Sequence, residues 1–189
     1  MIKSYEDYLF YREEDRRALG QLRKKPKLIG DLKNNIYKFQ IMLRKLEYVK
    51  NCKPGVVSKV YYYILRYRFQ KISDTLRFEV PFNVCGPGLC LVHGGTIIIN
   101  GSTKIGKNCR IQSMVNIGSN DRTKVGAPII GDNVFIGPGA KIYGEIKIAN
   151  NIAIGANSVV NKSFSEENVT IAGVPAKVVS KKGTSDIIG

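Results

Sequence analysis

The sequence is short of histidine, tryptophan and acidic side chains. Its 189 residues include one histidine and no tryptophan, and 15 acidic residues are outnumbered by 30 basic ones, which gives a formal net charge of +15. A single histidine excludes a site that needs several imidazole ligands from one chain. The charge calls for an anionic partner, and nucleic acid, a membrane surface and polyphosphorylated small molecules all qualify.

Long apolar runs and paired cysteines are also missing. No apolar run approaches the roughly 20 residues that span a bilayer, and the first residues lack the pattern of a signal peptide. Cys52, Cys85, Cys90 and Cys109 form neither a C-x-x-C pair nor a recognisable disulfide framework. We therefore expect a cytoplasmic protein with reduced, structural thiols.

The first 77 residues are poor in glycine and carry apolar side chains at helical spacing, which predicts a small helical region over 1–77. Ser4 is the expected N-cap of a first helix that ends at Gly20. A second helix is predicted over 29–48 and a third over 56–76. The tyrosines and arginines of the third helix favour packing, with the arginines reaching to solvent, over stacking on nucleic-acid bases.

From residue 78 onward, helical spacing disappears and a period of six appears. The recurring aliphatic residues are Ile99, Ile105, Ile111, Ile117, Ile130, Ile136, Ile142, Ile148, Ile154 and Val160. A second small or apolar residue follows four positions later, at Thr103, Cys109, Val115, Val134, Ala140, Ile146, Ile152 and Ser158. Five of the aliphatic residues precede a glycine, which fits a tight corner where a β-carbon is unwelcome and φ is positive.

A six-residue unit with two inward positions suits one flat face of a β-solenoid. It is too short for a helical hairpin or a propeller blade. The gap between Ile117 and Ile130 is one residue longer than two hexads. Residues 121–127 are therefore predicted to form a loop that leaves a corner of the solenoid, and such loops often carry function.

Near the end of the chain stands Ile171-Ala172-Gly173-Val174-Pro175-Ala176-Lys177. With the hexads, this string resembles the left-handed parallel β-helix acyltransferases, in the serine acetyltransferase-like branch that includes capsule and exopolysaccharide O-acetyltransferases. The resemblance is strong over residues 78–182 and weaker in the helices. It implies a left-handed parallel β-helix domain over 78–189, acetyl-CoA as cosubstrate, no metal, and a homotrimer or a dimer of trimers.

The resemblance also makes His93 the general base. His93 stands in Leu91-Val92-His93-Gly94-Gly95-Thr96, which aligns with the stretch where serine acetyltransferases place their catalytic histidine. A side chain that titrates near neutrality suits the removal of a hydroxyl proton as the oxygen attacks a thioester. Backbone N–H groups of Gly94 and Gly95, or of an adjoining subunit, would hold the developing oxyanion.

The sequence departs from the serine enzymes around this histidine. Pro81 falls where the aspartate that orients the base would be, so Glu79, Asn83 or a backbone carbonyl would have to replace it. Val92 takes the place of the acidic residue that recognises the amino group of serine.

The interrupting loop departs as well. Ala127 stands before Pro128 where the serine enzymes carry a second histidine, and Asp121 with Arg122 are candidates for acceptor binding. These losses favour a neutral hydroxyl acceptor on a sugar.

Coenzyme A carries a 3′-phosphate and a pyrophosphate, so basic side chains are expected near one end of the prism. Lys177 matches the family position, and Lys162, Lys181 and Lys182 are further candidates. The residues that match close-approach positions for the pantetheine arm are Gly118, Ser119, Ala140, Ala156, Ala172 and Gly173. For the alanines, a structural role as small inward or corner residues explains the match as well as direct contact with coenzyme A does.

Other functions explain fewer residues. Gly101 to Lys107 has the form G-x-x-x-x-G-K, but Asn108 occupies the position that a phosphate-binding loop gives to serine or threonine. One histidine excludes a β-helical carbonic anhydrase. A basic scaffold or nucleic-acid-binding protein would leave His93 and the 171–177 string unexplained.

We therefore expect acetyl transfer to a sugar hydroxyl in polysaccharide or capsule biosynthesis, with serine O-acetylation for cysteine biosynthesis as the alternative. No nucleic-acid partner is expected. The basic helices would build a contact between trimers, cover the acceptor site or lie close to a membrane.

Overall fold

Three α-helices precede the strands. They are α1 (Tyr5–Ala18), α2 (Leu32–Cys52) and α3 (Val56–Leu76). This computed structural model describes residues 1–119 and 126–188. As predicted, Ser4 caps α1, because its Oγ accepts the N–H of Asp7 at 3.0 Å.

The second helix differs from the prediction at both ends. It begins at Leu32, because Asp31 Oδ1 accepts the N–H of Asn34 at 2.9 Å and so caps the helix three residues beyond the expected start. It continues to Cys52. In the part of the chain that the structure describes, no helix is long and apolar enough to cross a membrane.

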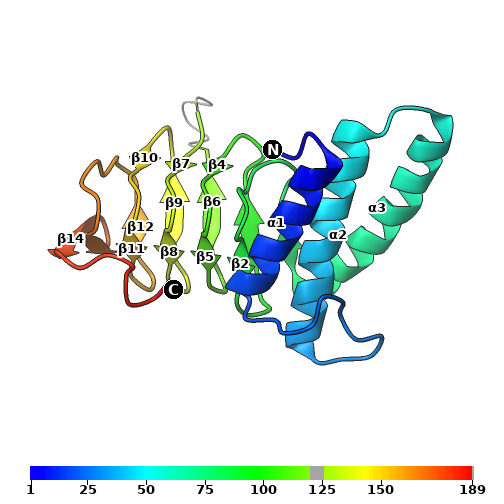
Figure 1. Ribbon diagram of the computed structural model, residues 1–189. Coiled ribbons are helices and arrows are strands. Elements are labelled where there is room, and N and C mark those ends of the chain that lie inside the picture. The colour runs from blue at the N-terminus through cyan, green and yellow to red at the C-terminus, as the bar shows by residue number, and fades with distance from the viewer. Residues whose placement is uncertain (120–125, 189) are drawn as a thin grey trace.

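The remaining elements are short strands that stack into a prism (Figure 1). Their bounds are β1 (Phe78–Glu79), β2 (Cys90–Leu91), β3 (Ile97–Ile99), β4 (Lys104–Ile105), β5 (Arg110–Ile111), β6 (Asn116–Gly118), β7 (Ile129–Ile130), β8 (Phe135–Ile136), β9 (Lys141–Tyr143), β10 (Lys147–Ile148), β11 (Ala153–Ile154), β12 (Val159–Val160), β13 (Thr170–Gly173) and β14 (Ala176–Ser180).

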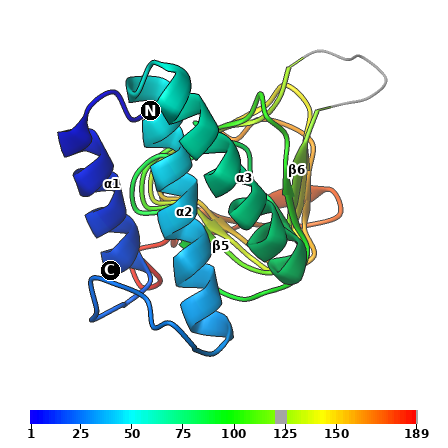
Figure 2. The same ribbon diagram turned by 90° about the vertical axis from the view of Figure 1, so that its right-hand side faces the viewer.

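The strands form three sheets, one for each face of the prism. The first sheet has the order β1-β3-β6-β9-β12, the second β4-β7-β10, and the third β2-β5-β8-β11-β13-β14. All pairs are parallel except β13 with β14. Seen along the prism, successive coils lie one behind another (Figure 2). The predicted fold class, helices followed by a parallel β-helix of hexapeptide repeats, is confirmed.

The hexad register predicts the interior correctly. None of the ten recurring aliphatic side chains is more than 5% exposed, and none of the eight residues at the second position exceeds 6%. Each fully buried isoleucine contributes roughly 1.5–3 kcal/mol through removal of apolar surface from water. The buried cluster continues without a break into the side chains of α2 and α3.

The corners of the prism differ from the prediction. The glycines that follow the aliphatic residues do not have positive φ. They are needed because the next coil approaches closely: a β-carbon at Gly106 would lie 2.6 Å from the carbonyl oxygen of Gly131. The left-handed backbone conformation occurs instead at a column of asparagines, Asn108, Asn133, Asn151 and Asn168, with φ of 55–58°.

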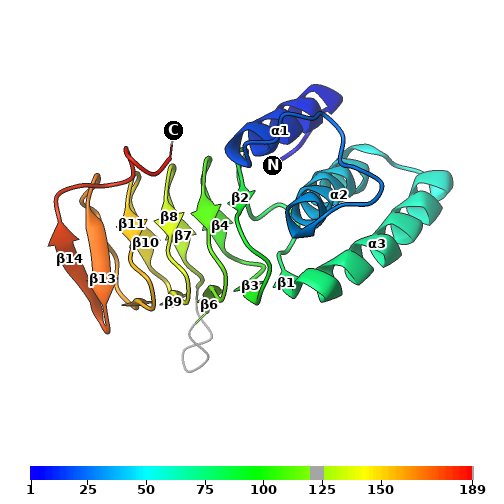
Figure 3. The same cartoon turned by 90° about the horizontal axis from the view of Figure 1, so that it is seen from below.

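This asparagine column is held together by its own side chains. Asn108 Nδ2 donates to Asn133 Oδ1 at 2.9 Å, and Asn133 Nδ2 donates to Asn151 Oδ1 at 2.9 Å. The C-terminal segment 181–188 returns along the same corner toward α1 (Figure 3). There Thr184 Oγ1 donates to the carbonyl of Asn133 at 2.8 Å.

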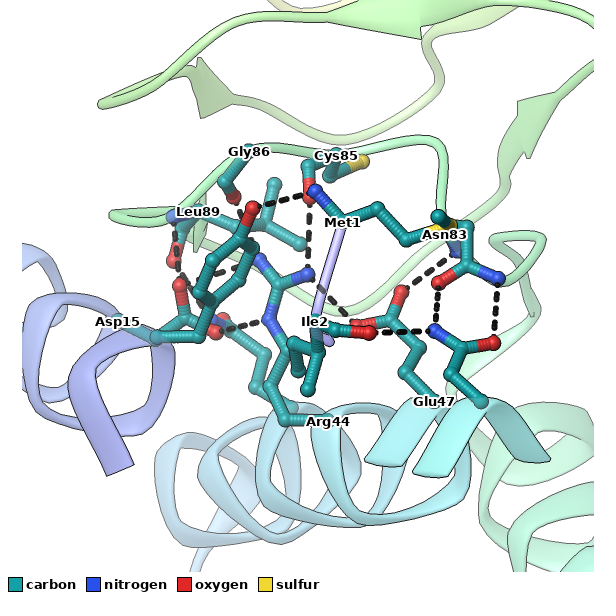
Figure 4. Close-up of polar contacts among 12 residues, drawn as sticks. Met1, Ile2, Asp15, Arg44, Glu47, Asn83, Cys85, Gly86 and Leu89 are labelled. Atoms are coloured by element: carbon teal, nitrogen blue, oxygen red, sulfur yellow. Dashed lines mark hydrogen bonds and ion pairs between the residues drawn. The ribbon is translucent and has the colours of Figure 1, made fainter. Parts of the chain in front are cut away.

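A buried ion cluster joins the helices to the first coil (Figure 4). The guanidinium of Arg44, which is 0% exposed, contacts Asp15 at 2.8 Å and Glu47 at 3.0 Å. It also donates to the carbonyls of Cys85 and Gly86 at 2.9 and 2.6 Å. The helical part is thereby fastened to the start of the solenoid.

The two carboxylates bind the first coil as well. Asp15 accepts the N–H of Leu89 at 2.9 Å, and Glu47 accepts the N–H of Asn83 at 2.7 Å. Burial opposes the charge of Arg44, but the two carboxylates hold the pKa of Arg44 above its ordinary value.

The four cysteines are free thiols, as predicted. Three of them are buried, and burial raises the pKa of Cys85 to about 12. A thiol in this state is a poor nucleophile, which agrees with a structural role.

Replacement of Arg44 should weaken the contact between the helices and the solenoid. We expect Arg44→Met to lower the free energy of unfolding by about 3–5 kcal/mol, because it leaves two buried carboxylates without their cation. Chemical denaturation measures the change. The control is Arg17→Met, which removes a surface guanidinium paired with Glu13 and Glu14 and should cost under about 1 kcal/mol. Equal losses in the two variants would show that the cluster does not stabilise the fold.

The asparagine column predicts a difference between alanine and glycine at one position. Asn133→Ala should lower the free energy of unfolding by about 2–3 kcal/mol, because alanine resists the left-handed conformation and both ladder bonds are lost. Asn133→Gly keeps the backbone conformation and should be the more stable of the two by about 1 kcal/mol. Thermal or urea unfolding distinguishes them, and a glycine variant no better than alanine would show that backbone strain plays no part.

Candidate active site

His93 follows β2 at the corner where the chain turns from the third sheet into the first. Two backbone bonds hold this turn: the N–H of Val92 donates to Ile111 O at 3.2 Å, and the N–H of Gly95 donates to Leu76 O at 3.1 Å. The imidazole is exposed. Because the N–H of Gly95 is already engaged, it is not available as the oxyanion donor that the sequence suggested.

A buried glutamine of α2 fixes the strand that leads into this turn. Gln40 Nε2 donates to Leu89 O at 2.6 Å, and Gln40 Oε1 accepts the N–H of Leu91 at 3.2 Å. Gln40 is 1% exposed, so both bonds are shielded from water. The helix therefore sets the position of the chain two residues before His93.

The imidazole lines a cleft of about 440 Å³ between the helices and the solenoid. The helical side of the cleft is Ala18, Leu19, Asp31, Leu32, Lys33 and Ile36, and the solenoid side is Cys90, Val92, His93 and Arg110. Leu32 lies directly over the turn, since a β-carbon at Gly94 would approach its Cδ1 to 2.9 Å. Val92, a predicted acceptor-binding residue, is half-buried in this wall.

The cleft continues into a second groove of about 510 Å³ along the asparagine column. The two hollows share Ala18, Cys90 and Arg110, and the far wall of the groove includes Ser185 and Ile187 of the C-terminal segment. Space beside His93 therefore extends along the solenoid.

The lining of the cleft is mostly apolar, and basic side chains outnumber acidic ones among its charged residues. Lys33 and Arg110 carry positive charge, and Asp31 is the one acidic residue of its lining. Arg110 Nη1 lies 3.7 Å from the sulfur of Cys90. Burial raises the pKa of the Cys90 thiol, and the charge of Arg110 opposes this rise.

Glu79, the predicted partner of the base, lies elsewhere on this chain. It belongs to β1, where it pairs with Ile98, and it lines a different hollow with Lys50 and Phe82. Across residues 1–119 and 126–188 no hydrogen bond joins Glu79 to His93. The structure of one chain does not bring the two residues together.

The predicted cofactor residues fall on two corners of the prism. Ala156, which follows β11, and the Ala172–Gly173 pair, which ends β13, lie on the same side as His93. Lys177 is opposite Ala172 in the β13–β14 ladder and is exposed. Gly118 and Ser119 lie at the other end of the first sheet, where Ser119 Oγ is 3.4 Å from Asn100 Nδ2.

The remaining predicted site residues are Ala140, Asp121 and Arg122. Ala140 is 0% exposed, so its side chain fills the interior and only its backbone remains for contact with a ligand. Asp121 and Arg122 lie outside the described residues. Within the described part of the chain, no cluster of three or more potential metal ligands is found.

Apart from Val92, the residues that surround His93 were not predicted from the sequence. Arg110 precedes an inward isoleucine of the hexads, so the sequence indicates that it points outward. The N-terminus of α2 lies over Arg110 in the folded chain, and no local sequence pattern predicts this arrangement.

A family model described as bacterial transferase hexapeptide (six repeats) matches residues 127–162. A serine acetyltransferase of Staphylococcus epidermidis is 40% identical over 118 residues, which is 59% of this chain and 55% of that protein. The chain thus spans about half the length of the curated relatives it matches.

Solved structures share the fold over nearly the whole chain. A serine acetyltransferase from Brucella abortus in complex with coenzyme A has a TM-score of 0.67 and 25% identity, covering 95% of this chain and 70% of that one. One from Neisseria gonorrhoeae in complex with serine has a TM-score of 0.63 and 26% identity, covering 94% and 71%.

The hexapeptide repeats and the parallel β-helix are features that this chain shares with the hexapeptide-repeat transferases. Within that class, the similarities described above are to serine acetyltransferases, over 118 residues in sequence and over most of the chain in fold.

The contacts of Gln40 generate a prediction about the His93 turn. Gln40→Met preserves volume but leaves two buried backbone groups unpaired, so we expect a loss of about 2–4 kcal/mol in unfolding free energy. Hydrogen exchange should show earlier loss of protection at the amide of Leu91. Gln70→Met, on the exposed face of α3, is the control and should change neither measurement by a detectable amount. Unchanged protection at Leu91 would mean that α2 does not hold this strand.

Proposed function

We propose that the protein is an acetyl-CoA-dependent O-acetyltransferase with His93 as the general base. The observation that carries this proposal is the location of the single histidine. It is exposed in a cleft at a solenoid corner, on the same side of the prism as the Ala172–Gly173 strand that resembles the cofactor-binding end of the family.

The reaction needs one proton acceptor and one oxyanion donor. The neutral imidazole takes the proton of the acceptor hydroxyl while its oxygen forms a bond to the acetyl carbonyl carbon. The tetrahedral intermediate then collapses, the carbon–sulfur bond breaks, and the imidazolium returns the proton to the departing thiolate. The N–H of Gly94, or a donor from a neighbouring subunit, would stabilise the oxyanion.

Coenzyme A would lie along the corner that carries His93. Ala156 and Gly173 offer close approach of the backbone to the pantetheine arm, and Lys177 offers its charge to a phosphate. Gly118 and Ser119 belong to the opposite corner of the first sheet. A homotrimer would bring that corner of one subunit toward His93 of the next, and Glu79 could then act on a neighbour's base.

Serine is one candidate acceptor. The serine acetyltransferases described above favour it over the sugar that the sequence suggested. Charges of both signs near His93, with Asp31 and Arg110 in one lining, also suit a zwitterion.

A sugar hydroxyl is the second candidate. Val92 lines the cleft directly beside the base where a carboxylate would be needed to pair an ammonium group. Its apolar side chain favours an acceptor that presents a hydroxyl without a neighbouring amine.

The test is release of free coenzyme A from acetyl-CoA, followed with a thiol reagent. Serine and a panel of saccharides serve as acceptors, and His93→Gln and His93→Ala are compared with the wild type. Loss of the base should lower kcat by about 10²–10⁴-fold, with an unchanged fold by circular dichroism. Activity that survives in both variants would overturn the mechanism.

The acceptor panel separates the two candidates. Release stimulated by serine alone would assign serine O-acetylation, and release stimulated by a saccharide alone would assign sugar O-acetylation. If no acceptor in the panel stimulates release of coenzyme A, the proposed acetyltransferase activity is rejected.

A further inference from the structure

The cleft at His93 is continuous with a basic surface on the connection between α1 and α2. Asp31 and Lys33 line both the cleft and an adjoining hollow of about 160 Å³. The basic residues of that hollow are Arg23, Lys25, Lys27 and Lys33. Together with Arg110 in the cleft, these five side chains are called the cationic track below.

The connection that carries the track is fastened to α2. The hydroxyl of Tyr37 lies 3.1 Å from the carbonyl of Arg23, and Asn34 exchanges two hydrogen bonds with the backbone of Lys27 at 2.7 and 3.3 Å. Lys38 Nζ donates to the carbonyl of Leu28 at 2.8 Å. Because the backbone is held in this way, the basic side chains are displayed beside the cleft.

The charge of the track is not neutralised locally. Over residues 1–119 and 126–188, none of its five cations lies within ion-pair distance of a carboxylate. Asp31, the one acid of both linings, is engaged as the cap of α2. By contrast, Arg16 is paired with Glu13 and Arg44 with Asp15.

The track is also remote, along the solenoid, from Lys177, the candidate phosphate-binding residue. The helices lie at one end of the prism and β14, with Lys177, at the other (Figure 1). The phosphates of coenzyme A would be bound toward Lys177. The cations at the helical end therefore remain for the second substrate.

We infer that the cationic track binds phosphate groups of the acceptor, so that the substrate class is a phosphorylated or nucleotide-linked saccharide whose hydroxyl meets His93. This inference rests on the proposed acetyltransferase function. Lys33 and Arg110 contact the part of the acceptor next to the reacting sugar, and Arg23, Lys25 and Lys27 contact the more distant phosphate. Charged donors in this number favour phosphate over a single carboxylate.

The test compares matched acceptors in the coenzyme A release assay. N-acetylglucosamine, its 1-phosphate and its uridine diphosphate derivative increase in phosphate content, the last with a uridine as well, and glucuronic acid supplies a carboxylate instead. We expect the KM to fall at least tenfold from the neutral sugar to the uridine diphosphate form, and this preference to weaken at high salt. Calorimetric titration with uridine diphosphate alone measures binding without turnover.

The decisive variant is Arg23→Gln/Lys25→Gln/Lys27→Gln. It should raise the KM for the phosphorylated acceptor and weaken uridine diphosphate binding about tenfold or more, with kcat and the KM for acetyl-CoA unchanged. The matched control is Lys59→Gln/Arg66→Gln/Arg68→Gln, which removes the same charge from exposed positions of α3 and should change neither value.

Several outcomes would overturn the inference while the acetyltransferase function stands. Among the acceptors, these outcomes are equal use of neutral and phosphorylated sugars, and a preference for glucuronic acid. For the track variant, they are unchanged turnover of serine, an effect no larger than that of the α3 control, and a change confined to the KM for acetyl-CoA. Absence of coenzyme A release with every acceptor, serine included, would instead reject the proposed function.

Discussion

The buried guanidinium of Arg44 lies at the centre of the polar contacts that join the helices to the first coil of the solenoid. It carries a full charge with no access to water, and its donors are divided between carboxylates of the helices and carbonyls of the first coil. Separation of helices and solenoid would strand that charge, which is costly in a nonpolar environment. The cleft at His93 has one wall from each part. The relative position of the two walls, and with it the shape of the cleft, therefore depends on this ionic contact.

The sequence allowed prediction of features that repeat and of features that are local. The aliphatic hexads between residues 99 and 160 identified inward positions of the solenoid correctly, because each occurrence reports the same environment. Ser4 as a cap and the bounds of α3 also follow from neighbouring residues. The role of the corner glycines was misjudged, because the contact that requires them comes from the next coil, which is far away in sequence. For the same reason the asparagine ladder was not foreseen.

The candidate site was predictable in its centre and not in its surroundings. His93 could be identified because the chain offers no other imidazole and because its neighbours match a known arrangement. Lys33 and Arg110 are separated by more than half of the helical region and the first coils, and only the packing of α2 on β2 brings them to one cleft. Glu79 is the opposite case, since it is near His93 in the sequence but lines a different hollow in the folded chain.

The two ends of the prism are covered in different ways, by helices at one end and by the antiparallel strand β14 at the other. A stack of coils in which each contacts only its neighbours has no single centre whose loss unfolds the whole. Under a pulling force applied along the prism, such a stack would unfold one coil at a time, and the unfolding force would rise and fall by a small amount with each coil. The terminal covers also hide rows of unpaired strand groups. If the helices or β14 detached, the exposed edge strands would pair with strands of other molecules. The terminal elements therefore prevent edge-to-edge association into a filament.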